Sequence, residues 1–403
     1  MSDIGNLEAG LSLAGSHPLS WRHALLQRMV AELRYGRLTC VTPDGRVIER
    51  RAPLPGPEAR LVLHRWRALR SLILGGDDGF AESFLHGDWS SPDLTAFLTL
   101  AAQNFDGRFR TPWPLRALHR LRHGLNANSR RGAKRNIMAH YDLGNDFYAA
   151  WLDRSMLYSS ALYEHPGDSL DQAQDRKLAL VTDWLGAQPG DRVLEIGCGW
   201  GALACRLGRL GAHVTALTLS PAQRVFAQDA VDEAGLQAEV SVHLRDYRDE
   251  GGQFDRIVSI EMMEAVGEAY WPVYFRALRD RLRPGGRAVL QVITIEAARF
   301  GTYRTTPDFI QQHIFPGGML PAKAHIDREA RRANLRPVRS RHFGESYALT
   351  LAAWRARFLA AWPDLQALGF DERFRRLWLY YLGYCEAGFR TGAIDVGLYE
   401  LHG

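Results

Sequence analysis

Short apolar runs alternate with amphipathic segments along the second half of the chain. Five of these runs have the length of strands: Arg192–Ile196, His213–Thr218, Val240–Leu244, Arg256–Ile260 and Arg287–Ile295. Three segments between them have helical spacing: Gly201–Leu210, Pro221–Ala234 and Tyr270–Leu282. Alternation of this kind predicts a doubly wound α/β sheet, in which crossover helices connect parallel strands.

The pattern changes after the fifth predicted strand. Residues Glu296–Ala324 are expected to form an insertion, a helical lid over the sheet. Helical spacing returns over Leu349–Trp362 and Glu372–Phe389, and a final strand is predicted around Ile394–Leu401. Residues 136–403 are therefore expected to form one Rossmann-like domain.

The first part of the chain has a different organisation. Helices are predicted over Trp21–Tyr35 and after Ser91-Pro92, with a hairpin-like piece over Leu38–Arg51 that turns at Pro43-Asp44-Gly45. We expect residues 1–125 to form a smaller, mostly helical accessory domain, joined by a connector that ends at about residue 135.

Composition restricts the class of protein. The chain has 403 residues, of which 46% are hydrophobic and 24% charged, as in a soluble globular protein of two domains. No apolar run approaches the ~18 residues of a membrane span, and the first residues do not resemble a secretory signal. Four cysteines without C-x-x-C or zinc spacing predict free thiols in a reducing cytoplasm and no metal site.

Charge is concentrated in the connector. Arg108–Arg135 holds nine basic residues and no acidic residue, although the net charge of the chain is only +5. Such a segment is suited to polyanions, either phospholipid headgroups or nucleic acid, and a solvated linker remains the alternative. Lysine is rare, since it occurs only at Lys134, Lys177 and Lys323 among 50 basic residues.

A glycine-rich turn follows the first predicted strand of the sheet. Glu195 ends the strand, and glycines follow at Gly197, Gly199 and Gly201. Backbone without Cβ atoms lets a ligand approach closely, and Glu195 can receive the ammonium of an amino-acid-bearing nucleotide. This combination resembles the S-adenosylmethionine (SAM) site of class I methyltransferases; a structural turn or another nucleotide is the alternative.

Later strand ends supply further cofactor candidates. Thr218 and Gln223 follow the second strand, where ribose hydroxyls are expected, and no carboxylate occupies that position. Asp246 and Tyr247 follow the third strand and are suited to the edge and the face of an adenine ring.

Several motifs in a fixed order resemble one family. They are His140–Tyr148, Met156–Ser160, Gly197–Gly201, Phe254–Ile260, Met263–Gly267 and Phe315–Gly318. Together they resemble the cyclopropane-fatty-acyl-phospholipid synthase family, which includes the mycolic acid methyltransferases. The resemblance implies a class I SAM methyltransferase that acts on the double bond of an unsaturated acyl chain. It assigns to the cofactor Tyr158, Ser159, Gly197, Gly199, Trp200, Gly201, Thr218, Leu219 and Gln223.

The chemistry requires a base and a dry site. An alkene is a weak nucleophile that must be held against the sulfonium methyl, and its attack leaves a carbocation that must lose a proton. The family resemblance implies a bound bicarbonate as the base, held by Cys, Glu, His and Tyr. The matching positions here are Ser160, Glu264, Gln291 and Tyr347. Aromatic side chains suit the cation, and the candidates are Phe315, Tyr347, Trp378, Tyr380 and Tyr381.

Two of these four positions depart from the family pattern. Ser160 replaces Cys and Gln291 replaces His, so the product is expected to be either a cyclopropane or a methyl- or methylene-branched chain. Cys385 matches a cysteine once considered as a nucleophile, but packing is the simpler role for it.

The resemblance also implies where the protein acts and what it contacts. It indicates a cytoplasmic protein, peripheral on the inner face of an anionic membrane, that acts on phospholipid acyl chains and possesses an N-terminal domain engaging the bilayer. A homodimer is suggested by family analogy alone. The competing functions are a nucleic-acid methyltransferase, for which the motifs of amino-methylating enzymes are missing, and a non-catalytic lipid-binding relative.

Overall fold

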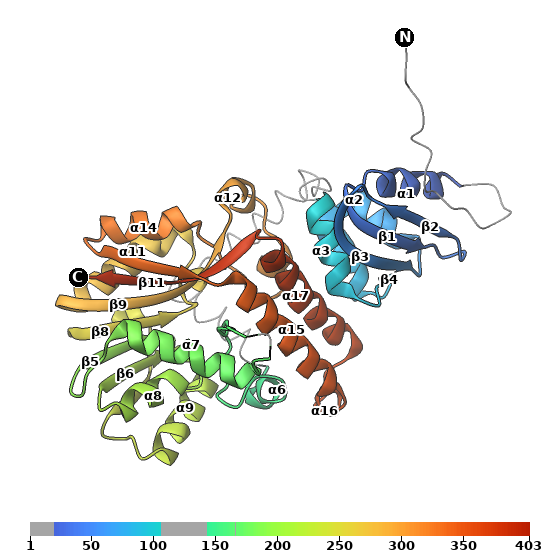
Figure 1. Ribbon diagram of the computed structural model, residues 1–403. Coiled ribbons are helices and arrows are strands. Elements are labelled where there is room, and N and C mark those ends of the chain that lie inside the picture. Colours follow the sequence, from blue (N-terminus) through green and yellow to red (C-terminus); the bar gives the residue numbers. More distant parts are fainter. Residues whose placement is uncertain (1–19, 106–142, 166) are drawn as a thin grey trace, which may run out of the picture. The chain divides into compact units, whose positions relative to one another are not determined.

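The computed structural model describes residues 20–105, 143–165 and 167–403, which form two compact units (Figure 1). The predicted basic connector and the start of the His140–Tyr148 motif lie outside these residues. The described part of the first unit consists of residues 20–105 and Phe370–Thr391, and that of the second consists of residues 143–369 and Gly392–Gly403. All four cysteines are free thiols, as expected.

The second unit contains the predicted parallel sheet. Its seven strands are β5 (Arg192–Ile196), β6 (His213–Thr218), β7 (Val240–Leu244), β8 (Phe254–Ile260), β9 (Leu282–Ile295), β10 (Arg336–His342) and β11 (Ile394–His402). Their order is β10-β11-β9-β8-β5-β6-β7. Strands β5 to β9 pair in parallel, and β11 runs antiparallel to both β9 and β10.

Helices connect the parallel strands as the alternation predicts. The crossover helices are α8 (Ala202–Arg209), α9 (Pro221–Glu233) and α11 (Trp271–Arg281), and α7 (Leu170–Leu185) precedes the first strand of this sheet. The Ser220 hydroxyl caps α9 by accepting from the backbone N–H of Gln223, with Pro221 in the first turn. These helices pack against the sheet, so the predicted doubly wound α/β architecture is confirmed.

Further helices complete this unit. They are α6 (Asn145–Ala149), α10 (Met263–Val266), α12 (Ala297–Tyr303), α13 (Phe309–His313), α14 (Lys323–Arg332), α15 (Gly344–Ala360) and α16 (Trp362–Ala367), with two 3-10 turns at Tyr247–Asp249 and Glu268–Tyr270. The predicted insertion is therefore helical. The edge strand β10 was not predicted, because its side chains are almost all exposed and give no apolar alternation.

The first unit contains more strand than the sequence pattern suggests. A four-stranded sheet of order β2-β1-β3-β4 is built from β1 (Tyr35–Val41), β2 (Val47–Arg51), β3 (Leu54–Leu63) and β4 (Trp89–Ser90). The helices are α1 (Trp21–Ala31), α2 (Arg67–Leu85), α3 (Leu94–Phe105) and α17 (Glu372–Arg390). The predicted hairpin is β1 and β2, whereas β3 was missed because two prolines and a glycine interrupt its start.

Helix α17 changes the domain boundary. The sequence assigns it to the 136–403 domain, but it packs in the first unit beside α3. Its Tyr380 ring lies 5.6 Å from Phe84, and the Thr95 hydroxyl donates to Glu386 at 3.3 Å. Contacts between distant parts of a chain leave no local signal, so this exchange could not be inferred from periodicity. Trp378, Tyr380 and Tyr381 are accordingly buried side chains of this first unit.

Candidate active site

A cavity opens at the carboxyl ends of the central strands in the second unit. From β5 the chain continues to β6 and β7 on one side, and returns to β8 and β9 on the other side. This reversal of strand order leaves a crevice beyond β5 and β8, which is the usual ligand position in such sheets. Ten residues predicted for the cofactor line this cavity: Tyr158, Ser159, Glu195, Gly197, Gly199, Trp200, Thr218, Leu219, Gln223 and Tyr247.

The three glycines of the turn have different tasks. Gly197 has φ +82, and a Cβ there would lie 2.5 Å from the sulfur of Met262. Gly199 has φ +53, and a Cβ would meet no atom within 4 Å, so its backbone borders open space. Gly201 does not line the cavity; a Cβ would lie 3.0 Å from the Cβ of Ala227, so this glycine lets α8 approach α9. The first two glycines shape the cavity and the third shapes the packing behind it.

Glu195 presents an unsatisfied carboxylate to the cavity. Its side chain is buried, and its Oε2 atom has no hydrogen-bond partner. Burial raises the pKa of Glu195 to about 8, and the charge of Lys177 acts in the opposite direction. A buried acceptor that lacks a partner is costly unless a ligand supplies a donor. The carboxylate therefore fits the ammonium of an amino-acid-bearing cofactor.

Polar groups at the end of β6 are arranged for hydroxyl recognition. The Thr218 hydroxyl donates to Gln223 Oε1 at 2.9 Å and accepts from the backbone N–H of Ser220. Because its oxygen is engaged, the Gln223 amide can offer its NH2 group to a ribose hydroxyl. These residues fit the predicted ribose end of the cofactor.

Asp246 has a different place from the one predicted. Its carboxylate is paired with Arg248, whose Nη2 lies 2.5 Å from Oδ2, and it also accepts from the Arg248 backbone N–H. It caps the turn after β7 and does not line the cavity, whereas its neighbours Arg245 and Tyr247 do. The adenine edge therefore has Arg245 and Tyr247 as its nearest candidates, and Arg245 was missed.

Helix α7 holds the segment that carries Tyr158 and Ser159. Gln174 donates from Nε2 to the carbonyl of Ser159 at 2.9 Å, and Lys177 donates to the Ser159 hydroxyl at 2.7 Å. Both α7 side chains are almost fully buried. Neither residue was predicted. The rarity of lysine in this chain, which has only three, is a sequence signal that could have pointed to Lys177.

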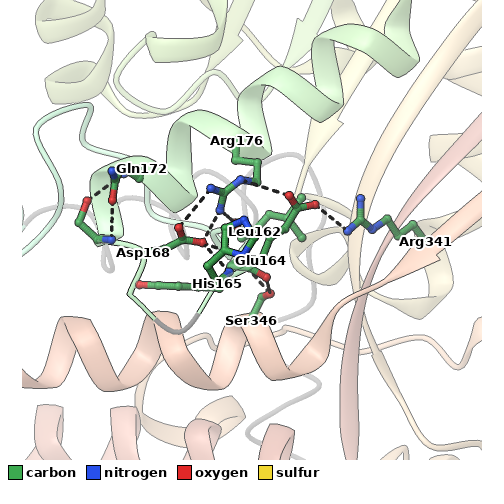
Figure 2. Close-up of polar contacts among 10 residues, drawn as sticks. Leu162, Glu164, His165, Asp168, Gln172, Arg176, Arg341 and Ser346 are labelled. Carbon is green, nitrogen blue, oxygen red and sulfur yellow. Dashed lines mark hydrogen bonds and ion pairs between the residues drawn. The ribbon is translucent and has the colours of Figure 1, made fainter.

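The same segment is fixed farther along its length (Figure 2). Arg176 on α7 donates to the carbonyl of Leu162 and pairs with Asp168 at 2.5 Å. Glu164 lies between Arg176 and Arg341 of β10, at 3.4 and 3.1 Å respectively. These contacts connect the segment to the sheet edge and keep its cavity-lining part in one conformation.

Glu261 is the centre of a hydrogen-bond cluster that the sequence did not predict. Its Oε1 accepts from the backbone N–H of Ser160 at 2.9 Å and from Gln291 Nε2 at 2.7 Å. Its Oε2 accepts from the Tyr347 hydroxyl at 2.8 Å. Three of the four residues predicted to hold bicarbonate therefore surround a carboxylate of the chain itself.

This cluster corrects the roles expected from the resemblance. The Ser160 hydroxyl points away from Glu261 and donates to the carbonyl of Ala161, so Ser160 contributes its backbone N–H. Glu264 is not among the cavity-lining residues; it accepts from the backbone N–H of Ile293 and leaves Oε2 unsatisfied. Since these donors already bind Glu261, they do not form an open bicarbonate site.

Backbone conformation marks Glu261 as unusual. It has φ +51, a region in which a side chain is strained and glycine is the ordinary residue. Strain of this kind persists where surrounding contacts hold it, often at functional sites. Burial raises the pKa of Glu261, while the hydrogen bonds from Ser160, Tyr347 and Gln291 lower it. The Glu-Met-Met-Glu run showed a second acid, but no local pattern distinguished the two.

Burial also raises the pKa of Glu264, to about 8, and the charge of Glu261 adds to this effect. Two neighbouring carboxyl groups are not readily ionised together. At neutral pH we therefore expect the ionised group to be Glu261, which has three donors, and the protonated group to be Glu264.

Aromatic side chains pack around Tyr158, which lines this part of the cavity. Tyr158 lies 5.3 Å from Trp354, and Tyr347 meets the same indole edge-on at 6.1 Å, measured between ring centroids. None of the aromatic residues predicted for the cation lines the cavity, and neither does Cys385 on α17. Among residues with described positions, no group of His, Cys, Asp and Glu is arranged to hold a metal ion.

Comparisons with known sequences identify relatives of this protein. Residues 128–398 match the family model described as mycolic acid cyclopropane synthetase. The tuberculostearic acid methyltransferase of Mycobacterium tuberculosis is 43% identical over 359 residues, which are 83% of this chain and 81% of that protein. The cyclopropane-fatty-acyl-phospholipid synthase of Escherichia coli is 35% identical over 341 residues, which are 82% of this chain and 84% of that protein.

Solved structures give the same relationship. A mycolic acid cyclopropane synthase complexed with SAH and CTAB has a TM-score of 0.63 and 32% identity, and the match covers 67% of this chain and 98% of that one. A coclaurine N-methyltransferase bound to SAH has a TM-score of 0.62 at 18% identity, a likeness of fold alone. The family match contains the whole cavity described above.

Proposed function

This chain belongs to the mycolic acid cyclopropane synthetase family, and we propose that it converts an unsaturated phospholipid acyl chain to a methylene-branched one. As a family member it is a SAM-dependent methyltransferase that acts on lipids. The finer assignment concerns the substrate and the product. The observation that carries it is the Glu261 carboxylate, held by Ser160, Gln291 and Tyr347.

The bound cofactor supplies an electrophilic methyl group on a sulfonium. Glu195 is suited to hold its ammonium, and Thr218 with Gln223 its ribose, so that the methyl group has one fixed direction. The Tyr158 ring lines the cavity and packs against Trp354, and such an aromatic face keeps water away from the reacting carbon and faces a cation favourably.

Glu261 is proposed as the proton acceptor. Transfer of the methyl group to one alkene carbon leaves a cation on its neighbour, and the product must then lose one proton. A carboxylate fixed by three donors can take that proton on an oxygen without a separate anion. Its backbone strain is consistent with a functional constraint rather than with packing.

Three features favour the branched product over ring closure. Burial raises the pKa of Glu261, but hydrogen bonds from Tyr347, Gln291 and Ser160 act against this rise and engage both carboxylate oxygens. Proton removal is then slow enough for a hydrogen shift to move the cation to the methylated carbon. Proton loss from the new methyl group then yields a methylene branch. Gln291 and Ser160 depart from the family ligands, and a tuberculostearic acid methyltransferase is a relative at 43% identity. Saturating the branch would require a separate hydride donor.

The test is product analysis with a single defined lipid. Purified protein is incubated with SAM and an unsaturated phosphatidylglycerol in vesicles, and the acyl chains are examined by mass spectrometry and proton NMR. A gain of one CH2 with vinylidene protons supports the proposal. A gain of one CH2 with cyclopropane protons contradicts the product, and no gain with any unsaturated phospholipid contradicts the substrate.

Membrane association is proposed as peripheral and electrostatic. None of the helices within residues 20–105, 143–165 and 167–403 is long and apolar enough to cross a bilayer. The basic segment Arg108–Arg135 would contribute roughly 1 kcal/mol per well-placed arginine on an anionic surface. Vesicle binding should therefore fall as salt is raised, and a preference for RNA over vesicles would contradict the assignment. The homodimer and the cytoplasmic location remain family expectations.

A further inference from the structure

Lys177 lines the cavity together with its two unusual carboxylates, Glu195 and Glu261. Its side chain on α7 is 1% exposed, and its ammonium donates to the Ser159 hydroxyl at 2.7 Å. Glu195 and Glu261 line the same cavity, from the end of β5 and the end of β8 respectively. One buried cation therefore shares the cavity with the carboxylate suited to the cofactor ammonium and with the proposed proton acceptor.

A neutral hydroxyl does not compensate the desolvation of a buried ammonium. Removing a charge from water is costly unless opposite charges lie nearby. The charged groups that face Lys177 are Glu195, Glu261 and Asp153, the last from the loop before α7. Each of them favours the protonated lysine, whereas burial disfavours it.

The two carboxylates have further neighbours that titrate. The Cys198 thiol faces Glu195, and Glu264 and Tyr347 face Glu261. Burial raises the pKa of the Cys198 thiol well above its usual range, so this thiol stays neutral. Among the described groups that act on these two carboxylates, Lys177 is therefore the one that carries a positive charge.

We propose that Lys177 is the shared counter-ion of Glu195 and Glu261, and a positioning residue that favours the ionised form of the cofactor carboxylate. The part concerning Glu195 rests on the family cofactor, and the part concerning Glu261 rests on the proposed function. Binding of SAH tests the first part without any turnover. Its failure is therefore distinguishable from a failure of the product assignment.

The experiment compares SAH affinity in wild type and Lys177→Met by calorimetry from about pH 6.5 to about 9.5. Methionine retains a long apolar side chain without the charge. Loss of the ammonium should weaken SAH binding about tenfold or more at pH 7, the effect of a one-unit rise in the pKa of Glu195. The pKa of Lys177 is lowered to about 8, chiefly by burial.

The ratio of the two affinities is the decisive quantity. Above pH 8 the wild-type lysine loses its own charge, so the wild-type advantage should shrink toward one. Titration of the ligand amine occurs with both proteins and cancels in the ratio. A loss of affinity that is the same at every pH would mean that Lys177 acts through packing alone, and it would overturn the proposal.

Two variants separate charge from other effects. Lys323→Met removes an exposed lysine that pairs with Asp395, and its affinity ratio should stay near one throughout. Ser159→Ala removes the hydrogen bond that Lys177 donates but keeps the charges of Lys177 and Glu195, so its SAH affinity should retain the pH dependence of the wild-type protein. If Ser159→Ala equals Lys177→Met at every pH, the hydrogen bond and not the charge is responsible, and the proposal fails.

If Lys177→Met does not fold, Glu195→Gln is the variant that tests the proposal in its place. This variant removes the carboxylate that Lys177 is proposed to compensate, so the rise of SAH affinity between about pH 6.5 and 8 should disappear. An unchanged pH profile in Glu195→Gln would also overturn the proposal.

Discussion

The hydroxyl of Tyr347 donates a hydrogen bond to Oε2 of Glu261 at 2.8 Å, joining two residues 86 positions apart in the chain. Tyr347 comes from α15 and Glu261 from the end of β8. Gln291 reaches the same carboxylate from β9. The proposed proton acceptor is thus oriented by three separate elements and owes its geometry to the fold of the second unit.

Replacing Glu261 with Gln should abolish turnover and preserve cofactor binding. The amide has the shape of the carboxylate but does not accept the proton, and loss of a general base lowers rates by about 10²–10⁴-fold. The affinity for SAH should change by less than about threefold, because the proposed cofactor residues Glu195 and Gln223 are unchanged. Single-turnover product formation and calorimetry with SAH measure the two effects. Turnover near the wild-type rate would remove Glu261 from the mechanism.

Glu264→Gln should be milder than Glu261→Gln, although the resemblance assigned Glu264 to the base site. Glu264 does not line the cavity and is expected to be protonated, so an amide replaces a group of similar charge and shape. We expect turnover within about tenfold of wild type, measured in the same assay. An equal loss of turnover in both variants would indicate that Glu264 takes part in catalysis.

Tyr347→Phe should move the acid limb of the rate profile to higher pH. The Tyr347 hydrogen bond lowers the pKa of Glu261, so its removal raises that pKa and the base is protonated at a higher pH. The rate constant at saturating SAM should therefore fall earlier as pH decreases, with a recovery toward alkaline pH. A pH-independent loss would indicate that Tyr347 acts on the substrate and not through Glu261.

The pH dependence of protein stability should show the raised pKa of the Glu264 carboxyl group. Its pKa rises from an ordinary 4.5 to about 8 on folding, so the stability associated with it is full below about pH 4.5 and is lost as pH rises through 8. Glu264→Gln should thus raise the melting temperature at pH 9 and leave it nearly unchanged at pH 5. Thermal unfolding measures this, with the exposed Glu233→Gln on α9 as the control. Equal shifts at both pH values would contradict the burial argument.

The membership of α17 in the first unit is testable by a double-mutant cycle. Phe84 and Tyr380 are both buried, with ring centroids 5.6 Å apart. Each alanine substitution should destabilise this unit by about 3–5 kcal/mol, and an aromatic pair of this kind couples by about 0.5–1.5 kcal/mol. Denaturant unfolding of the full chain, followed by a probe in the first unit, measures the coupling. Additive effects would indicate that α17 does not pack against α2.

Local sequence patterns identified much of the second unit. Strand length, the N-terminal signals at Ser220 and Pro221 and the alternation of elements depend on neighbouring residues, and so β5 to β8 were predicted close to their observed bounds. Strand β9 begins at Leu282, five residues before its predicted start. The order of motifs identified the family, which the comparisons confirm. Strand β10 was not predicted because its exposed side chains give no apolar alternation. Helix α17 was predicted as a helix, but its unit was wrong because its packing depends on residues far along the chain.

The sequence by itself determined that a strand with Glu195 near its end leads into a turn with Gly197 and Gly199, because this segment is contiguous in the chain; it therefore predicted the cofactor end of the sheet. Only the tertiary structure decided which carboxylate receives the hydrogen bonds of Ser160, Gln291 and Tyr347. Glu261 and Glu264 are three residues apart and chemically alike. What separates them is the strained backbone at Glu261 and the convergence of β9 and α15 on its side chain. Such convergence brings together residues far apart in sequence, so no local pattern encodes it.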